Sequence, residues 1–109
     1  MHALRISAGG WLQTIEIDTN SARSSHPATL AVPHNLELWY TEESSADAEP
    51  SMAAMSLALS VCDLTPHDVP LICGEAVIVG IDPDTNTPTS MTRQQYQAIS
   101  YALLSSLAA

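Results

Sequence analysis

Apolar and polar residues alternate through the start of the chain. His2–Ala8 and Trp11–Asp18 each show the period of two that is typical of a half-buried strand, and Gly9-Gly10 separates them. Two glycines favour a two-residue hairpin turn, because such turns need positive φ angles. In the resulting register Leu4 lies opposite Ile15. The pattern therefore predicts an N-terminal hairpin with these two side chains on one face.

The next part of the chain alternates between polar and short apolar segments. Thr19–Ser25 is polar and turn-like, and His26–Val32 is a short apolar piece for which one or two helical turns are expected. Leu36–Glu42 alternates again and predicts a strand with Trp39 on its polar side. Glu42–Pro50 contains no base and no apolar residue larger than alanine, which indicates a surface loop.

Two helices and a buried strand are predicted in the second half. Ser51 is positioned to cap a helix, and the core-facing stripe of that helix is expected to be Met52, Met55, Leu59 and Cys62. Leu71–Ile81 contains a continuous apolar run rich in β-branched residues, which favours a strand covered on both faces. Thr92 and Gln95 form a capping box for the last helix. Its core stripe is expected to be Tyr96, Ile99, Leu103 and Leu107.

These elements predict an α+β fold. A small, mostly antiparallel sheet, made of the N-terminal hairpin plus two further strands, is expected to pack with two to three helices. The 109 residues are of ordinary size for one domain, and no repeat or linker divides them, so a single domain over 1–109 is expected. No stretch approaches the ~18 apolar residues of a membrane span, and no secretory signal is evident. A cytoplasmic protein is expected.

Charge narrows the class of partner. The formal net charge is −9, with twelve acidic residues and only three basic ones, Arg5, Arg23 and Arg93. The acid content is ordinary, so the imbalance comes from missing bases. Such a surface repels nucleic acid and anionic membranes and attracts basic proteins over about 8 to 10 Å at physiological salt. Direct binding to nucleic acid or membrane is therefore disfavoured.

The acidic residues suit a basic protein partner if they converge on one face. Trp39 and Tyr40 lie beside the densest acidic tract and would supply aromatic anchors. The expected partner-binding residues are Glu37, Trp39, Tyr40, Glu42, Glu43, Asp47, Glu49, Asp82 and Asp84. The alternative for the same carboxylates is that they only keep the protein in solution.

Signals for catalysis or metal binding are weak. Cys62, His67 and Cys73 carry donors that zinc accepts, but they lack the close pairs of a structural zinc site and an evident fourth ligand. The acids Glu42 and Glu43 lie in a loop without an enclosing apolar pocket. The sequence contains no glycine-rich phosphate-binding motif and no nucleophile elbow. No catalytic residue, metal or cofactor is expected, and the protein is interpreted as non-enzymatic.

Parts of the chain resemble a known group of proteins. In Cys73–Asp82 a glycine, an apolar strand and a second glycine precede an acidic turn, and Thr89–Thr92 with Gln95 follow as a helix cap. Together with Ala3–Ile6 and Leu38–Glu43, this pattern resembles a family of small uncharacterised acidic proteins encoded by phages and plasmids. The resemblance implies no activity. It implies a mobile-element setting, in which small acidic proteins often act against host nucleic-acid-binding machinery, including restriction and CRISPR effectors.

The leading hypothesis is a non-enzymatic interaction protein of a phage or mobile element. Its acidic surface is expected to bind a basic, nucleic-acid-binding host protein and inhibit it, as anti-restriction and anti-CRISPR proteins do. One alternative is a small accessory or structural module that forms a homodimer through its last helix or a strand edge. Another is an enzyme or metal protein that uses Cys62, His67 and Cys73.

Overall fold

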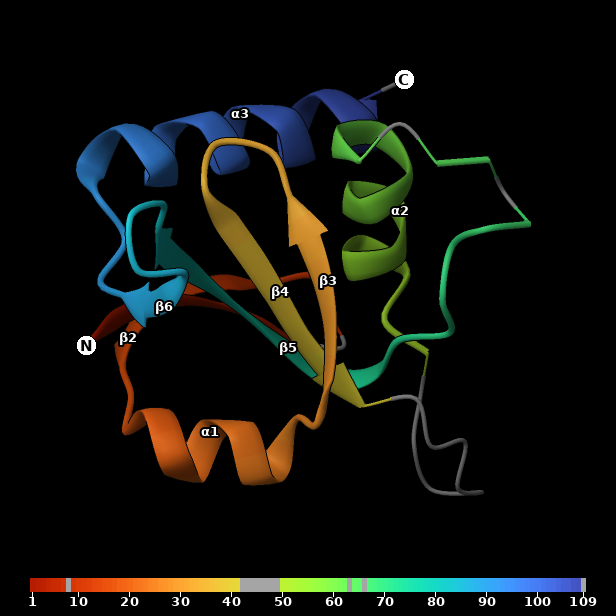
Figure 1. The fold of residues 1–109 in the computed structure, drawn as a ribbon. Coiled ribbons are helices and arrows are strands. Elements are labelled where there is room, and N and C mark those ends of the chain that lie inside the picture. The colour runs from red at the N-terminus through yellow and green to blue at the C-terminus, as the bar shows by residue number, and fades with distance from the viewer. Residues whose placement is uncertain (8, 42–49, 63, 66, 109) are drawn as a thin grey trace.

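An antiparallel sheet organises the chain (Figure 1). Over residues 1–7, 9–41, 50–62, 64–65 and 67–108, which the computed structural model describes, there are six strands and three helices. The strands are β1 (His2–Ile6), β2 (Leu12–Glu16), β3 (Ala28–Val32), β4 (Leu36–Thr41), β5 (Cys73–Asp82) and β6 (Thr87–Thr89). The helices are α1 (Thr19–Ser25), α2 (Met52–Val61) and α3 (Arg93–Ala108). The predicted α+β class is confirmed, with a sheet larger than the hairpin plus two strands.

The strand β5 lies at the centre of the sheet. The strand order is β2-β1-β5-β4-β3, and β6 pairs with the last residues of β5. The helix α1 connects the two edge strands β2 and β3, so it crosses one face of the sheet, and α2 and α3 cover the other face (Figure 1). The sheet therefore has a separate apolar cluster on each side.

The side chains of β4 and β5 alternate between these two clusters. On the α2 and α3 side, the buried side chains of β4 and β5 are Leu36, Leu38, Tyr40, Ala76 and Ile78. On the α1 side, the buried residues are Ala3, Trp39, Val77 and Val79. Each large aliphatic side chain buried in this way contributes about 1.5 to 3 kcal/mol. The continuous apolar run of β5 arises because the strand is covered on both faces, as predicted.

The N-terminal hairpin is one residue away from the predicted register. Ile15 pairs with Ala3, not with Leu4. The backbone N–H of Ser7 donates to the carbonyl of Trp11 at 3.0 Å, so three residues lie between these two, and the second glycine has a φ of 90°. A three-residue loop ending in a positive-φ glycine is a common hairpin geometry. Because side chains alternate, the shift moves Ile15 to the α1 side.

Two local predictions between residues 19 and 32 are wrong. Thr19–Ser25 forms the helix α1, not a turn, and the Asp18 carboxylate caps it by accepting a hydrogen bond from the Asn20 N–H at 3.1 Å. Ala28–Val32 forms the edge strand β3, not helical turns, because it pairs with β4 along its whole length. Pairing with a neighbouring strand outweighs the weak local preference of such a short segment.

The predicted core face of α2 is wrong for Met52 and Leu59, whereas Met55 and Cys62 pack against the core, and the predicted cap is confirmed. Ser51 is buried, and its Oγ accepts a hydrogen bond from the Ala54 N–H at 3.3 Å. Met52 is 67% exposed and Leu59 is 38% exposed. The buried residues of the helix are Ala53, Ala54, Leu57 and Ala58. The three small alanine side chains allow the helix backbone to pack closely on the core, with the large side chain of Leu57 buried among them.

The capping box of α3 is confirmed. The Thr92 N–H donates to Gln95 Oε1 at 2.8 Å, and the Gln95 N–H donates to Thr92 Oγ1 at 3.2 Å. Ile99 is fully buried, as the predicted stripe requires, whereas the side chains of Leu103 and Leu107 lie outside the described part of the chain. Among the described residues, no helix is both long and apolar enough to span a membrane.

Candidate functional site

The structure describes only some of the predicted partner-binding acids. Four of them, Glu42, Glu43, Asp47 and Glu49, lie outside the described residues. The residues that flank this tract, Thr41 and Pro50, both pair with Cys73 at the start of β5. Asp82 lies at the other end of this ten-residue strand, about 30 Å away at ~3.3 Å per residue. Asp82 and Asp84 are therefore distant from the points where the tract begins and ends.

Trp39 and Tyr40, the predicted aromatic anchors for a partner, are both buried in this structure. Trp39 is 1% exposed and Tyr40 is 4% exposed. The Trp39 Nε1–H donates to Glu37 Oε1 at 2.6 Å, and the Arg23 guanidinium lies 5.2 Å from the centroid of the Trp39 ring. The indole thus contacts a cation from α1 and a carboxylate from β4. The polar side of β4 is covered by α1, a helix that the local sequence did not predict.

Asp82 has a structural role in the turn between β5 and β6. Its Oδ1 accepts a hydrogen bond from the Asp84 N–H at 2.9 Å, which is the geometry of an Asx turn. The Asn86 N–H donates to the Asp82 carbonyl at 2.7 Å, and Asn86 has a φ of 54°. Asp84 is exposed. Of this pair, Asp84 is therefore the one available to an external cation.

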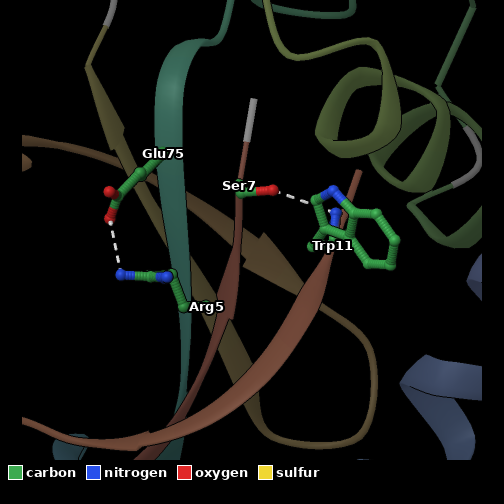
Figure 2. A network of polar contacts seen from close by, with 4 residues as sticks. All are labelled: Arg5, Ser7, Trp11 and Glu75. Atoms are coloured by element: carbon green, nitrogen blue, oxygen red, sulfur yellow. Dashed lines mark hydrogen bonds and ion pairs between the residues drawn. The ribbon is translucent and has the colours of Figure 1, made fainter. Parts of the chain in front are cut away.

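Arg5 and Arg23 interact with other side chains of the fold. Arg5 Nη1 lies 3.8 Å from Glu75 Oε2, and this is the ion pair found among the described residues (Figure 2). Arg23 stacks on Trp39 and also donates to the carbonyls of His26 and Pro27 at 3.5 and 3.4 Å. Arg5 and Arg23 thus neutralise local groups beside α1. They leave most of the negative charge of the chain uncompensated.

Cys62 and Cys73 are free thiols on different elements. Cys62 caps the end of α2, its Sγ donates to the Ala31 carbonyl at 3.5 Å, and burial raises its pKa. Cys73 begins β5 and is 4% exposed, and His67 is exposed. Within the described part of the chain, no group of three or more His, Cys, Asp or Glu residues is arranged to hold a metal ion.

A hollow on the α1 side of the sheet brings together polar groups that sequence reasoning missed. Its volume is about 250 Å³, and it lies between α1, β1, β2 and β5. The polar residues that line it are Arg5, Asp18, Ser21, Ser25, His26 and Glu75. The apolar ones are Ile15, Ile17, Ala22 and Val77. No local motif connects these residues, because they come from four separate elements; only the pairing of β1 with β5 and the crossing of α1 unite them.

Two residues that line this hollow, Arg5 and His26, each have one buried polar atom. Arg5 Nε and His26 Nδ1 are shielded from solvent and have no hydrogen-bond partner among the described residues. Burial lowers the pKa of His26, and the nearby Glu75 carboxylate opposes that effect. Buried polar groups in proteins are normally hydrogen-bonded.

A second hollow, at the start of α3, has its polar groups already engaged. Its volume is about 360 Å³, and its lining includes His34, Asn35 and Gln95. Gln95 Nε2 donates to the carbonyls of His34 and Asn35 at 2.8 and 3.2 Å. These bonds hold a tight turn in which both His34 and Asn35 have positive φ angles of 73° and 58°. This site is therefore accounted for by the turn that it stabilises.

Trp11 is an exposed aromatic residue that the predicted site did not include. It is 78% exposed, and its backbone N–H donates to Ser7 Oγ at 3.0 Å (Figure 2).

Comparison with family models, curated proteins and solved structures finds no match to this chain. Function is therefore inferred from the charges and geometry of its own residues.

Proposed function

We propose that the chain is a non-enzymatic interaction protein that binds a basic, nucleic-acid-binding host protein and inhibits it. The observation that carries this proposal is the charge of the folded chain. The net charge is −9, and two of the three arginines are engaged with Glu75 and Trp39. A surface of this kind attracts a cation-rich groove and competes there with nucleic acid.

The geometry favours the Cys73 end of the sheet as the binding surface. The sequence between Thr41 and Pro50 contains four carboxylates and no base, and both flanking residues pair with Cys73. Glu75, on an exposed position of β5, is two residues further along. Asp82 lies at the opposite end of β5, and its carboxylate accepts a hydrogen bond from the Asp84 N–H within its own turn. We therefore leave these two residues out of the proposed surface.

The mobile-element setting comes from the resemblance of Cys73–Asp82 and its flanking segments to small phage and plasmid proteins. In that setting, an acidic protein that occupies the basic groove of a restriction or CRISPR effector would block its access to DNA. The inhibitory role is the specific form of the proposal. Binding to a basic protein is its more general form. Binding is tested first and inhibition second.

The test is a pull-down from a bacterial lysate in about 50 mM and about 500 mM salt, followed by affinity measurement with the captured protein. Electrostatic binding predicts retention in low salt and release in high salt. The variant E42Q/E43Q is expected to weaken binding about tenfold, since ~0.7 kcal/mol is expected for each charge. The control E16Q/D84N changes the net charge equally, and we expect less than about a threefold effect.

Inhibition is tested with the same captured protein. Addition of the acidic chain should release labelled DNA from it in proportion to occupancy. Binding that does not depend on salt, or an equal loss of affinity in both double variants, would contradict the proposed surface. A partner that keeps its DNA would contradict the inhibitory role alone.

Self-association is a second candidate, and exposed apolar side chains favour it. Tyr101 on α3 is 76% exposed, and Trp11 and Met52 are 78% and 67% exposed. An added Cβ on Gly10 would lie 3.6 Å from Ala53 Cβ, so the Trp11 loop meets the start of α2 near Met52. Light scattering distinguishes the two functions. A stable dimer that Met52→Gln or Tyr101→Gln dissociates would support the homodimeric accessory module.

A further inference from the structure

The edge strand β2 has backbone groups that face away from the sheet. The Ser7 N–H of the hairpin donates to the Trp11 carbonyl at 3.0 Å, so Trp11 faces β1. Backbone groups alternate in direction along an antiparallel strand, so the N–H and C=O groups of Leu12, Thr14 and Glu16 point away from β1. Because β2 is the last strand on its side, no segment of the described chain bonds to these groups. We call them the open edge.

The open edge lacks the features that usually protect an edge strand. Such strands are normally protected by lysine, proline, a β-bulge or a covering segment. The sequence of β2 contains no basic residue and no proline, and the strand pairs with β1 in one unbroken register. Gln13, Thr14 and Glu16 are exposed. The strand β2 is therefore regular and accessible enough to pair with a further strand.

The opposite edge, on β3, is closed. The Cys62 Sγ donates to the Ala31 carbonyl at 3.5 Å, so Ala31 faces away from β4. The alternation places Pro27 and Pro33 on this same side, just before and just after β3, and proline has no N–H to donate. The Pro27 carbonyl also accepts a hydrogen bond from Arg23 at 3.4 Å. Two chains joined through β2 would expose β3 at both ends, so strand addition stops at a dimer and does not continue into a filament.

We propose that two copies of this chain pair through β2 in antiparallel orientation and form one continuous sheet. In the favoured register, Thr14 lies opposite Thr14 of the second copy, on a two-fold axis. Leu12 of each copy then pairs with Glu16 of the other, so every residue of the open edge has a hydrogen-bonding partner. A slip of two residues in either direction leaves Leu12 or Glu16 without a partner in the opposite strand.

The side chains are complementary in this register. Residues directly opposite each other across two antiparallel strands have their side chains on the same face. Glu16 lies opposite Leu12, whereas a register centred on Glu16 would place two carboxylates opposite each other. Trp11 lies opposite Ile17 in a non-hydrogen-bonded pair, in which side chains are closer. The indole is 78% exposed in the single chain, so it gains an apolar neighbour in the dimer.

This dimer does not depend on the proposed basic partner. It uses the open edge of β2, whereas the second candidate function uses exposed side chains such as Tyr101 on α3. Each copy has a net charge of −9, so repulsion between copies weakens as salt screens it. Dimerisation should therefore strengthen between about 50 and 500 mM salt, whereas binding of a basic partner should weaken. The opposite signs of these two effects make the two failures distinguishable.

Light scattering of the purified protein at about 0.5 mM and about 150 mM salt tests the interface. The wild type should approach twice the mass of one 11.6 kDa chain. T14K and T14E each place two like charges about 5 Å apart on the axis and should weaken dimerisation at least tenfold. An equimolar mixture of T14K and T14E should form the dimer again, because opposite charges then meet. The matched control T29K makes the same change on the exposed, closed edge of β3 and should leave the dimer intact, as should Y101Q.

Amide hydrogen exchange of the wild type provides a measurement that needs no substitution. Between about 0.05 and 1 mM protein, exchange at Leu12, Thr14 and Glu16 should slow at least tenfold, while exchange at Thr29 and Ala31 should not change. The proposal is overturned if the wild type has the mass of a single chain at about 0.5 mM. It is also overturned if T14K dimerises as the wild type does, if mixing T14K with T14E gives no dimer, or if the amides of β2 gain no protection.

Discussion

Trp39→Phe tests the interaction of the buried indole with groups from two elements. The substitution removes the 2.6 Å hydrogen bond from Nε1 to Glu37, and a bond to a charged group is worth about 1.5 to 3 kcal/mol. It also leaves unfilled space, because the Trp39 side chain is only 1% exposed, and this space costs about 1 kcal/mol of stability. A weaker contact with Arg23 adds about 0.5 kcal/mol. We expect a total loss of about 3 to 4.5 kcal/mol.

Urea denaturation followed by far-ultraviolet circular dichroism measures this loss. For a domain of this size, it should also lower Tm by more than about 10 °C. The matched control is Trp11→Phe, whose indole is 78% exposed and should change stability by less than about 0.5 kcal/mol. The two variants make the same chemical change, so their difference isolates burial and bonding from the loss of a tryptophan.

A double-mutant cycle with Glu37→Gln separates the hydrogen bond from packing. Gln keeps an acceptor but loses the charge, and charged hydrogen bonds are roughly twice as strong as neutral ones. We expect a coupling of about 1 to 2 kcal/mol between positions 37 and 39. Losses that add to within about 0.5 kcal/mol would show that Glu37 and Trp39 do not interact, and the assignment of this carboxylate to the fold would be wrong.

Three further predictions concern individual contacts. Gly80→Ala should destabilise by about 1 to 3 kcal/mol in urea denaturation, because its Cβ would lie 3.0 Å from the carbonyls of Thr89 and Ser90; a neutral effect would refute this. Burial lowers the pKa of His26 below its unfolded value near 6.5, so stability should be fully present above that pH and fall as pH decreases through it. His26→Gln should flatten this part of the pH profile, and an unchanged slope would contradict the burial. Iodoacetamide should modify native Cys62 at pH 7.5 at least tenfold more slowly than in urea, since burial raises its pKa, and equal rates would refute this.

The fold was predictable where the local pattern is strong. The sequence predicts the helix cap at Ser51, the capping box at Thr92 and the apolar run of β5, because each depends on side chains within a few residues of one another. The segments Thr19–Ser25 and Ala28–Val32 were not, because α1 is short and polar, and β3 is an edge strand that depends on β4. In such segments tertiary contacts decide the structure, and a short sequence window does not contain them.

The same distinction explains which site residues could be found. The net charge of the chain predicts the sign of a partner's charge without any structure. The burial of Trp39 depends on α1 crossing the sheet, and the meeting of Arg5 with Glu75 depends on the pairing of β1 with β5. The contacting residues in the second pair are seventy positions apart in the sequence. No spacing rule relates them, although Arg5 on the polar side of a predicted strand was a visible starting point.

The placement of the arginines also bears on the proposed partner-binding surface. If charge served only to keep the chain in solution, the positions of its few cations would be of little consequence. Instead, Arg5 and Arg23 both lie on the α1 side, one lining the hollow and the other covering Trp39. Thr41 and Pro50, which flank the acidic tract in the sequence, both pair with Cys73. Because Glu75 belongs to the proposed surface and forms an ion pair with Arg5, E75Q should weaken partner binding, whereas R5Q, which leaves the Glu75 carboxylate without its cation, should strengthen it; unchanged affinity in both variants would contradict the proposed surface.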